Sequence, residues 1–286
     1  LNADYKIKPW LKVGTTANYA NYTSKAISDG SGGTSYVSMI ATVMTLAPYI
    51  ADTYPADALP TQMQAQIANG FTLLQNANGD YYSCLGTMEQ VHPMVAIRMN
   101  DKKNTGNSLM GTLYANFTPI KDLVFTTRLG YRIATDNTYT HNNLYYGSAS
   151  ASNKDRNGVT RTSLSTTYYQ WENFVNYNTT LLDTHNISAM LGMSYSQSDQ
   201  IYVSAGVDKI AKDNLLYADV DWPAGDAVKS TGGHNYIYRK LSYFGRVGYD
   251  YKNRYMAQFA MRADAADASV LPPTNRWGYF PSASVG

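Results

Sequence analysis

Charged residues are scarce in this chain of 286 residues, since only 15% are Asp, Glu, Lys or Arg. An ordinary soluble domain carries about 25%. The net charge is +2, which gives no reason to expect a nucleic-acid partner. The chain has one cysteine, Cys84, so it can form neither a disulfide framework nor a cysteine-based metal site.

Long apolar runs are also absent. A membrane-spanning helix needs roughly 18 consecutive apolar residues, and the best candidate, Val37–Ala51, is interrupted by Ser38, Thr42, Thr45 and Pro48. Aromatic residues are plentiful, with 26 Tyr, 7 Phe and 4 Trp. Together with many β-branched residues, they argue against intrinsic disorder.

Apolar and polar residues alternate over long stretches. Between Leu123 and Ile133, every second residue except Thr127 is apolar or aromatic, and Arg128 and Arg132 fall on the other side. Ile187–Tyr195 and Tyr255–Arg262 repeat this pattern. Such alternation places an apolar and a polar face on the two sides of a β-sheet. We therefore predict an all-β, antiparallel protein with about nine strands, near residues 1–7, 10–24, 108–118, 122–139, 160–181, 185–204, 236–251, 254–265 and 277–286.

The predicted connections alternate in length. Short turns fall at Lys8–Pro9, Pro119–Lys121, Leu182–Thr184 and Lys252–Asn253, and long loops fall near residues 25–107, 140–159, 205–235 and 266–276. This sorting is typical of outer-membrane β-barrels. Within the longest loop, Tyr36–Ala47 and Thr61–Gly70 are predicted to form short helices. The first residue is not Met and the last three, Ser284–Gly286, lie in an unfinished alternating stretch, so we expect an interior piece of a longer protein. The alternative is a processed mature protein.

No catalytic or cofactor motif is present, and we expect neither an enzyme nor a bound cofactor. The four histidines, His92, His141, His185 and His234, are far apart and are interpreted as surface or loop residues. Four aspartates, Asp208, Asp213, Asp219 and Asp221, form a loose acidic group. Their oxygens could bind calcium, but the spacing matches no calcium loop and favours solvated loop charge.

Two groups of residues are candidates for binding. Arg128, Arg132, Arg246 and Arg262 lie opposite the apolar positions and would face the lumen of a barrel. They could contact a plug or a polar substrate, or form a ladder of charge pairs with Asp250 and Asp264. The loop aromatics Tyr217, Trp222, Tyr236 and Tyr238 could stack on sugar rings or pack the loop itself.

The C-terminal third resembles the barrel of SusC/RagA-like TonB-dependent transporters. The segment Leu241–Tyr255 carries Ser-Tyr-Phe-Gly-Arg, Tyr-x-Tyr and Arg-Tyr, and Arg-x-Asp and Phe-Pro-Ser-x-Ser-x-Gly follow. The matching residues are Ser242, Phe244, Gly245, Arg246, Tyr249, Tyr251, Arg254, Tyr255, Arg262, Asp264, Arg276, Trp277, Phe280, Pro281 and Ser282.

This resemblance implies active import of a nutrient across a Gram-negative outer membrane, with an oligosaccharide or a peptide as substrate. Residues 1–286 would belong to the barrel domain, about nine of roughly 22 strands. The plug domain and the remaining strands are absent from this sequence. The implied partners are a SusD-like surface lipoprotein over the long loops, TonB on the periplasmic side and membrane lipid.

Two other functions remain open from the residues alone. A surface β-rich module that binds glycans or acts as an adhesin would suit the tyrosine-rich loops. A barrel enzyme is disfavoured, because no acid, base and nucleophile cluster in the sequence.

Overall fold

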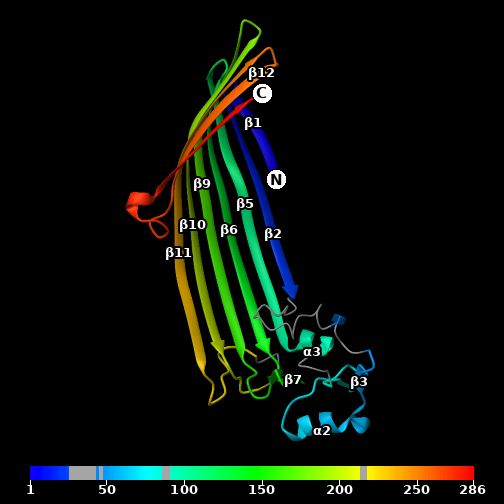
Figure 1. Ribbon diagram of the computed structural model, residues 1–286. Helices are drawn as coiled ribbons and strands as arrows, with labels where there is room; N and C mark the ends of the chain where they lie inside the picture. Colours follow the sequence, from blue (N-terminus) through cyan, green and yellow to red (C-terminus); the bar gives the residue numbers. More distant parts are fainter. Residues whose placement is uncertain (26–42, 45–47, 86–90, 213–217) are drawn as a thin grey trace.

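The computed structural model describes residues 1–25, 43–44, 48–85, 91–212 and 218–286. In these residues, nine antiparallel strands form one long twisted sheet in the order β1-β2-β5-β6-β9-β10-β11-β12-β13 (Figure 1). The strands are β1 (Asn2–Lys8), β2 (Leu11–Lys25), β5 (Asn100–Ile120), β6 (Leu123–Asn142), β9 (Val159–Leu181), β10 (His185–Val207), β11 (Lys229–Tyr251), β12 (Tyr255–Ala265) and β13 (Trp277–Val285). The predicted all-β antiparallel class is confirmed.

Short turns lie at one end of this sheet, and the long loops after β2, β6 and β10 lie at the other (Figure 1). The loop between β12 and β13 leaves the sheet partway along it, because β12 ends at Ala265, opposite Leu241 of β11. Within the described residues, the long loops contain two small hairpins and several short helices. These elements are β3 (Thr53–Tyr54), η2 (Ala56–Ala58), α2 (Thr61–Ala68), β4 (Tyr81–Tyr82), α3 (Pro93–Arg98), β7 (Tyr145–Ser148), β8 (Ala151–Asn153) and η3 (Pro273–Asn275). The helix expected from Thr61 is thus confirmed as α2. The one expected at Tyr36–Ala47 falls, except for Val43 and Met44, outside the described residues.

The register divides the sheet into two faces. Apart from the shifts beside the β1–β2 and β5–β6 turns, odd-numbered residues pair with odd and even with even on all these strands. Directly opposed residues share a face, so one face carries every odd residue and the other every even one. We call the face with the odd residues the apolar face and the face with the even residues the polar face. Exposed side chains on the apolar face include Leu113, Leu129, Trp171, Leu191, Val247 and Phe259.

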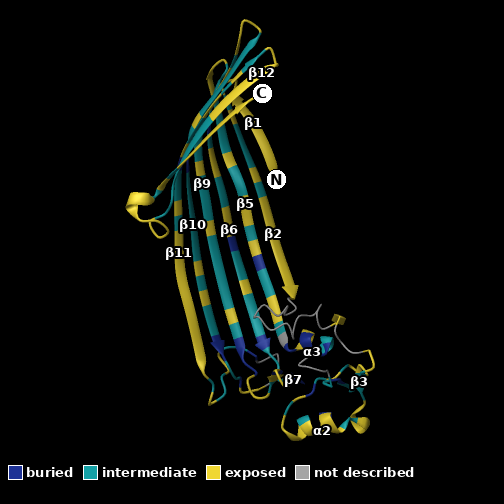
Figure 2. Ribbon diagram, in the orientation of Figure 1, coloured by how far each residue is buried: buried dark blue, intermediate teal, exposed yellow. Residues whose placement is uncertain are grey.

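Most of the buried hydrophobic residues lie at the long-loop end of the sheet (Figure 2), and Ala134 is buried within β6. One cluster contains Tyr82, Val91, Val95, Ala96 and Ala151, and a second contains Val159, Val207, Ile210 and Ala218. Along most of the strands, side chains are half-buried or exposed on both faces. None of the helices among the described residues is both long enough and apolar enough to cross a bilayer.

Two strands begin earlier than their sequence patterns indicate. β5 starts at Asn100 rather than near residue 108, and β11 starts at Lys229 rather than near residue 236. The added segments are polar and contain Gly106, Gly232 and Gly233, so neither shows an apolar alternation. Backbone pairing with β6 and β10 defines them as strands.

Two of the short turns require left-handed backbone. Leu182 and Asp183 have φ of 52° and 57°, and Lys252 and Asn253 have φ of 58° and 53°. Positive φ at both central residues is the type I′ geometry that matches the twist of a hairpin. Leu182 is 85% exposed, so no packing offsets the steric cost of this conformation, about 1–2 kcal/mol for an L-residue.

We therefore predict that Leu182→Asn raises the free energy of unfolding by up to about 1 kcal/mol, because Asn tolerates left-handed backbone. Leu182→Ile should lower it, because a β-branched side chain fits that region poorly. Urea unfolding of the full-length protein, followed by tryptophan fluorescence, measures both. Equal effects of the two substitutions would contradict a backbone origin.

Candidate functional site

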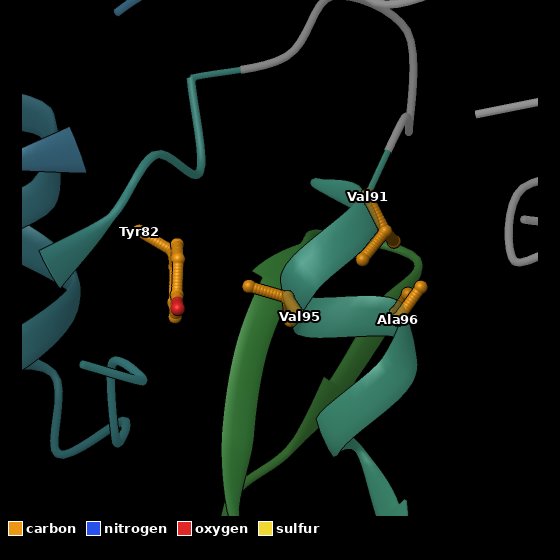
Figure 3. Close-up of a cluster of buried hydrophobic side chains, with 5 residues drawn as sticks. Tyr82, Val91, Val95 and Ala96 are labelled. Carbon is orange, nitrogen blue, oxygen red and sulfur yellow. The ribbon is translucent and has the colours of Figure 1, made fainter. Parts of the chain in front are cut away.

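The first loop cluster is built around α3. Val91, Val95 and Ala96 belong to one buried cluster with Tyr82 and with Ala151 of the β7–β8 hairpin, and the Val95 side chain points toward Tyr82 (Figure 3). His92 begins the helix, because its Nδ1 accepts a hydrogen bond from the Met94 amide at 3.1 Å. That bond leaves Nε2 to donate to Asp52 at 2.6 Å. The longest loop is therefore packed against the next loop at this end of the sheet.

The second cluster fastens the loop after β10 to the ends of β6 and β9. Arg161 on β9 donates two hydrogen bonds to Asp219, at 2.7 and 2.6 Å, and its guanidinium lies 4.9 Å from the centre of the Tyr139 ring. The Tyr139 hydroxyl donates to the Ala218 carbonyl at 2.8 Å. Because of the hydrogen bonds from Arg161, the pKa of Asp219 lies below its ordinary value. Arg156 pairs with Asp208 in the same region.

These ion pairs explain two of the four aspartates in the predicted acidic group. Asp208 and Asp219 each face an arginine, which assigns them a structural role in holding the loop. Asp213 lies outside the described residues. Among the described residues, no three metal-ligating side chains come together.

The polar face carries all four predicted arginines, because Arg128, Arg132, Arg246 and Arg262 occupy even positions. Arg128 pairs with Glu172 on the neighbouring strand, with Nε–Oε2 at 2.7 Å. Arg262 donates to Asp264 two residues along its own strand at 2.8 Å. For Arg132 and Arg246, the described residues supply no carboxylate partner.

The predicted charge ladder is therefore formed only in part. Asp264 pairs with Arg262, but Asp250 accepts hydrogen bonds from Asn186 and from the Asn253 amide and pairs with no arginine among the described residues. The partner of Arg128, Glu172, was not identified from the sequence. It lies 44 residues away along the chain, and only the strand register reveals that the two are opposite.

Glu172 belongs to a polar network that sequence reasoning missed. Gln170 donates to Glu172 at 2.8 Å, and the Tyr168 hydroxyl donates to Gln170 at 2.6 Å. These three side chains, with Arg128 and Arg132, line a hollow of about 1040 Å³ on the polar face. A possible signal was the polar alternation Tyr168, Gln170, Glu172, because residues two apart on a strand share a face.

The aromatic candidates divide between a loop and a strand. Tyr236 and Tyr238 are grouped by sequence with the loop aromatics, at the start of the predicted strand 236–251. Both lie well inside β11, on the polar face, with nearly parallel rings 6.5 Å apart. His234, two residues further along this face, stacks on Tyr202 at 5.0 Å. Trp222 lies in the loop after β10 and is 44% exposed. Tyr217 lies outside the described residues.

Two histidines differ from their expected surface positions. His92 and His141 are 4% and 1% exposed, because the packed loops cover the long-loop end of the sheet. His185 and His234 are strand residues whose rings contact tyrosines. The lone Cys84 is half-buried, and burial raises the pKa of its thiol to about 11.

The chain is similar in sequence to several TonB-dependent receptors. No protein-family model matches the chain. It is 23% identical over 98% of its length to TonB-dependent receptor P26 of Formosa agariphila, and 26% identical over 66% of its length to receptor P39 of the same organism. Over 46 residues it is 48% identical to TonB-dependent receptor SusC of Bacteroides thetaiotaomicron. The chain spans 25% and 17% of the lengths of P26 and P39.

The fold is also found in solved transporters. Structures of the RagAB peptide transporter and of the RagAB peptide importer in an open-open state match 98% and 99% of the chain, with TM-scores of 0.67 and 0.68 and 18% identity. The chain covers 28% of each transporter chain. The resemblance to SusC/RagA-like TonB-dependent transporters is thus confirmed in sequence and in fold. The relatives are named receptors and transporters, which are not enzymes.

We predict that Asp219→Asn increases hydrogen exchange in residues 218–228, because one acceptor of the two Arg161 bonds is lost. This partly exposed pair contributes at most about 1 kcal/mol. The neighbouring Asp221→Asn is the matched control and should leave exchange unchanged. Equal exchange in both variants would contradict the assigned role of Asp219.

The Arg161–Asp219 pair should also make the protection of residues 218–228 depend on pH. A carboxylate whose folded pKa is lowered stabilises the fold above its unfolded pKa, which is about 3.9, and this stabilisation is lost as the pH falls through the folded value. Protection of residues 218–228 by the Arg161–Asp219 pair should therefore persist from pH 8 to pH 5. It should fall only below about pH 4, and the difference between wild type and Asp219→Asn should disappear there.

Proposed function

We propose that this chain forms part of the transmembrane barrel of an outer-membrane, TonB-dependent nutrient importer. The observation that carries the proposal is the two-faced register, in which the exposed side chains of Leu113, Leu129, Trp171, Leu191, Val247 and Phe259 share one face and all four arginines share the other. A barrel in lipid needs this arrangement, with its apolar face outward and its polar face toward the lumen. The similarity to TonB-dependent receptors supports the same conclusion.

The orientation follows from the loop lengths. Outer-membrane barrels have short periplasmic turns and longer extracellular loops, so the packed loops would lie outside the cell. Strands β9, β10 and β11 each have 23 residues, and about 9–11 residues cross the bilayer. Their excess length would carry the loop clusters above the membrane, where a SusD-like lipoprotein could cover them.

The proposed substrate is an oligosaccharide. The nearly parallel Tyr236 and Tyr238 rings lie on the lumenal side of β11, above the bilayer, and aromatic rings with polar hydroxyls suit the two kinds of surface on a sugar. A peptide is the second candidate, because the structural neighbours are named peptide transporters.

The face assignment is tested by a matched pair on β12. Phe259 is 54% exposed on the apolar face, and its neighbour Gln258 lies on the polar face. Phe259→Lys should destabilise the full-length transporter in lipid by about 2–4 kcal/mol, the cost of a cation near mid-bilayer. Gln258→Lys should be tolerated. Unfolding in vesicles and the level in the outer membrane measure both, and the reverse result would exchange the two faces.

The substrate assignment is tested on β11. Tyr236→Ala and Tyr238→Ala should each weaken binding of an oligosaccharide that the wild-type transporter takes up, by about 3- to 10-fold, because one ring contact is lost. The control is Ile237→Ala, which removes the side chain between them on the apolar face. If all three variants bind equally and reach the surface equally, these rings do not stack on substrate.

A further inference from the structure

A row of rings crosses the apolar face at its short-turn end. His185, Tyr251 and Tyr255 lie directly opposite one another on β10, β11 and β12. The His185 ring lies 5.0 Å from that of Tyr251, and its Nδ1 is 2.7 Å from the hydroxyl oxygen of Tyr249. Tyr249 and Tyr255 are 42% and 58% exposed, so the described part of the chain leaves the row accessible.

Two cations of the β11–β12 turn lie over this row. Lys252 Nζ is 5.2 Å from the centre of the Tyr251 ring, and Arg254 Cζ is 5.5 Å from that of Tyr255. The two carboxylates of the same hairpin, Asp250 and Asp264, belong to the opposite face, where Asp250 accepts a hydrogen bond from Asn186. The two positive charges are therefore directed to the apolar face without an acidic partner in their own hairpin.

Aliphatic and phenyl side chains continue the apolar face beyond the row. Val247 and Phe259 are directly opposite each other, and Leu191 and Met261 lie one row further. The order along this face is thus two cations, then rings with polar tips, then an apolar surface. Lipid headgroups, interface and acyl chains follow the same order at a membrane boundary.

We propose that His185, Tyr249, Tyr251, Lys252, Arg254 and Tyr255 form a binding site for an anionic phospholipid headgroup in the periplasmic leaflet. Lys252 and Arg254 bind the phosphate, the hydroxyl of Tyr249 or Tyr251 donates to its oxygens, and an acyl chain lies along Val247 and Phe259. Arginine and lysine are the usual partners of phosphate, and charge-assisted hydrogen bonds are the stronger kind. This inference rests on the proposed function, because it requires the apolar face to be in lipid.

The test uses the full-length transporter purified in detergent, titrated with phosphatidylglycerol and examined by native mass spectrometry. Lys252→Gln or Arg254→Gln should each weaken lipid binding about 5-fold, and the double variant about 30-fold, since a basic residue near an anionic headgroup contributes about 1 kcal/mol. The exchange Lys252→Arg with Arg254→Lys should retain binding, because both charges remain.

The matched control is Lys121→Gln in the β5–β6 turn, where no ring lies beneath the cation among the described residues. If Lys121→Gln weakens binding as much as the turn variants, or if the double variant binds like wild type, the proposal is overturned. Heat-modifiable migration on gels shows that each variant is folded. A transporter that reaches the outer membrane and imports its substrate, yet shows no dependence on Lys252 and Arg254, refutes this site alone. A wild-type protein that never enters the membrane refutes the proposed function.

Discussion

The backbone ladder between neighbouring strands is the constraint on which the rest of the structure depends. Because almost every pairing joins odd residues to odd and even to even, one alternating pattern in the sequence becomes two chemically different surfaces. A shift of one residue between β9 and β10 would place Leu191 opposite Phe174 or Asn176, depending on its direction, instead of Val175, and would mix the faces. The arginines, the polar network around Glu172 and the ring row at the turns all derive their positions from this register.

The two ends of the sheet are stabilised in different ways. At the short-turn end, type I′ turns close the β9–β10 and β11–β12 hairpins, even where Leu182 fits the geometry poorly. At the long-loop end, the backbone leaves the ladder, and side chains replace it: apolar clusters around Val95 and Val207, and arginine pairs such as Arg161 with Asp219. Both buried hydrophobic clusters found among the described residues therefore lie at this end.

The features that this chain shares with its relatives and the features of its own side chains concern different parts of the function. The sequence identity to the relatives is 48% over a stretch of 46 residues and 23% over nearly the whole chain, and the fold is shared over nearly the whole chain. The polar-face hollow, the Tyr236–Tyr238 pair and the basic turn at Lys252 are features of this chain's own side chains. They bear on what the barrel binds on each side, whereas the shared fold bears on what kind of protein it is.

The sequence by itself determined the all-β class, the central parts of the strands and the sorting of turns and loops, because alternation with period two is a local property. It also placed the four arginines opposite the apolar positions. It could not reveal that Lys229–Asn235 and Asn100–Asn107 are strands, since these polar segments have no alternation and are ordered by bonds to β10 and β6. Nor could it reveal that Arg128 faces Glu172, that His141 is buried, or that Lys252 and Arg254 cover a row of rings. Those facts depend on which distant residues are brought together, and only the register and the packing of the loops decide that.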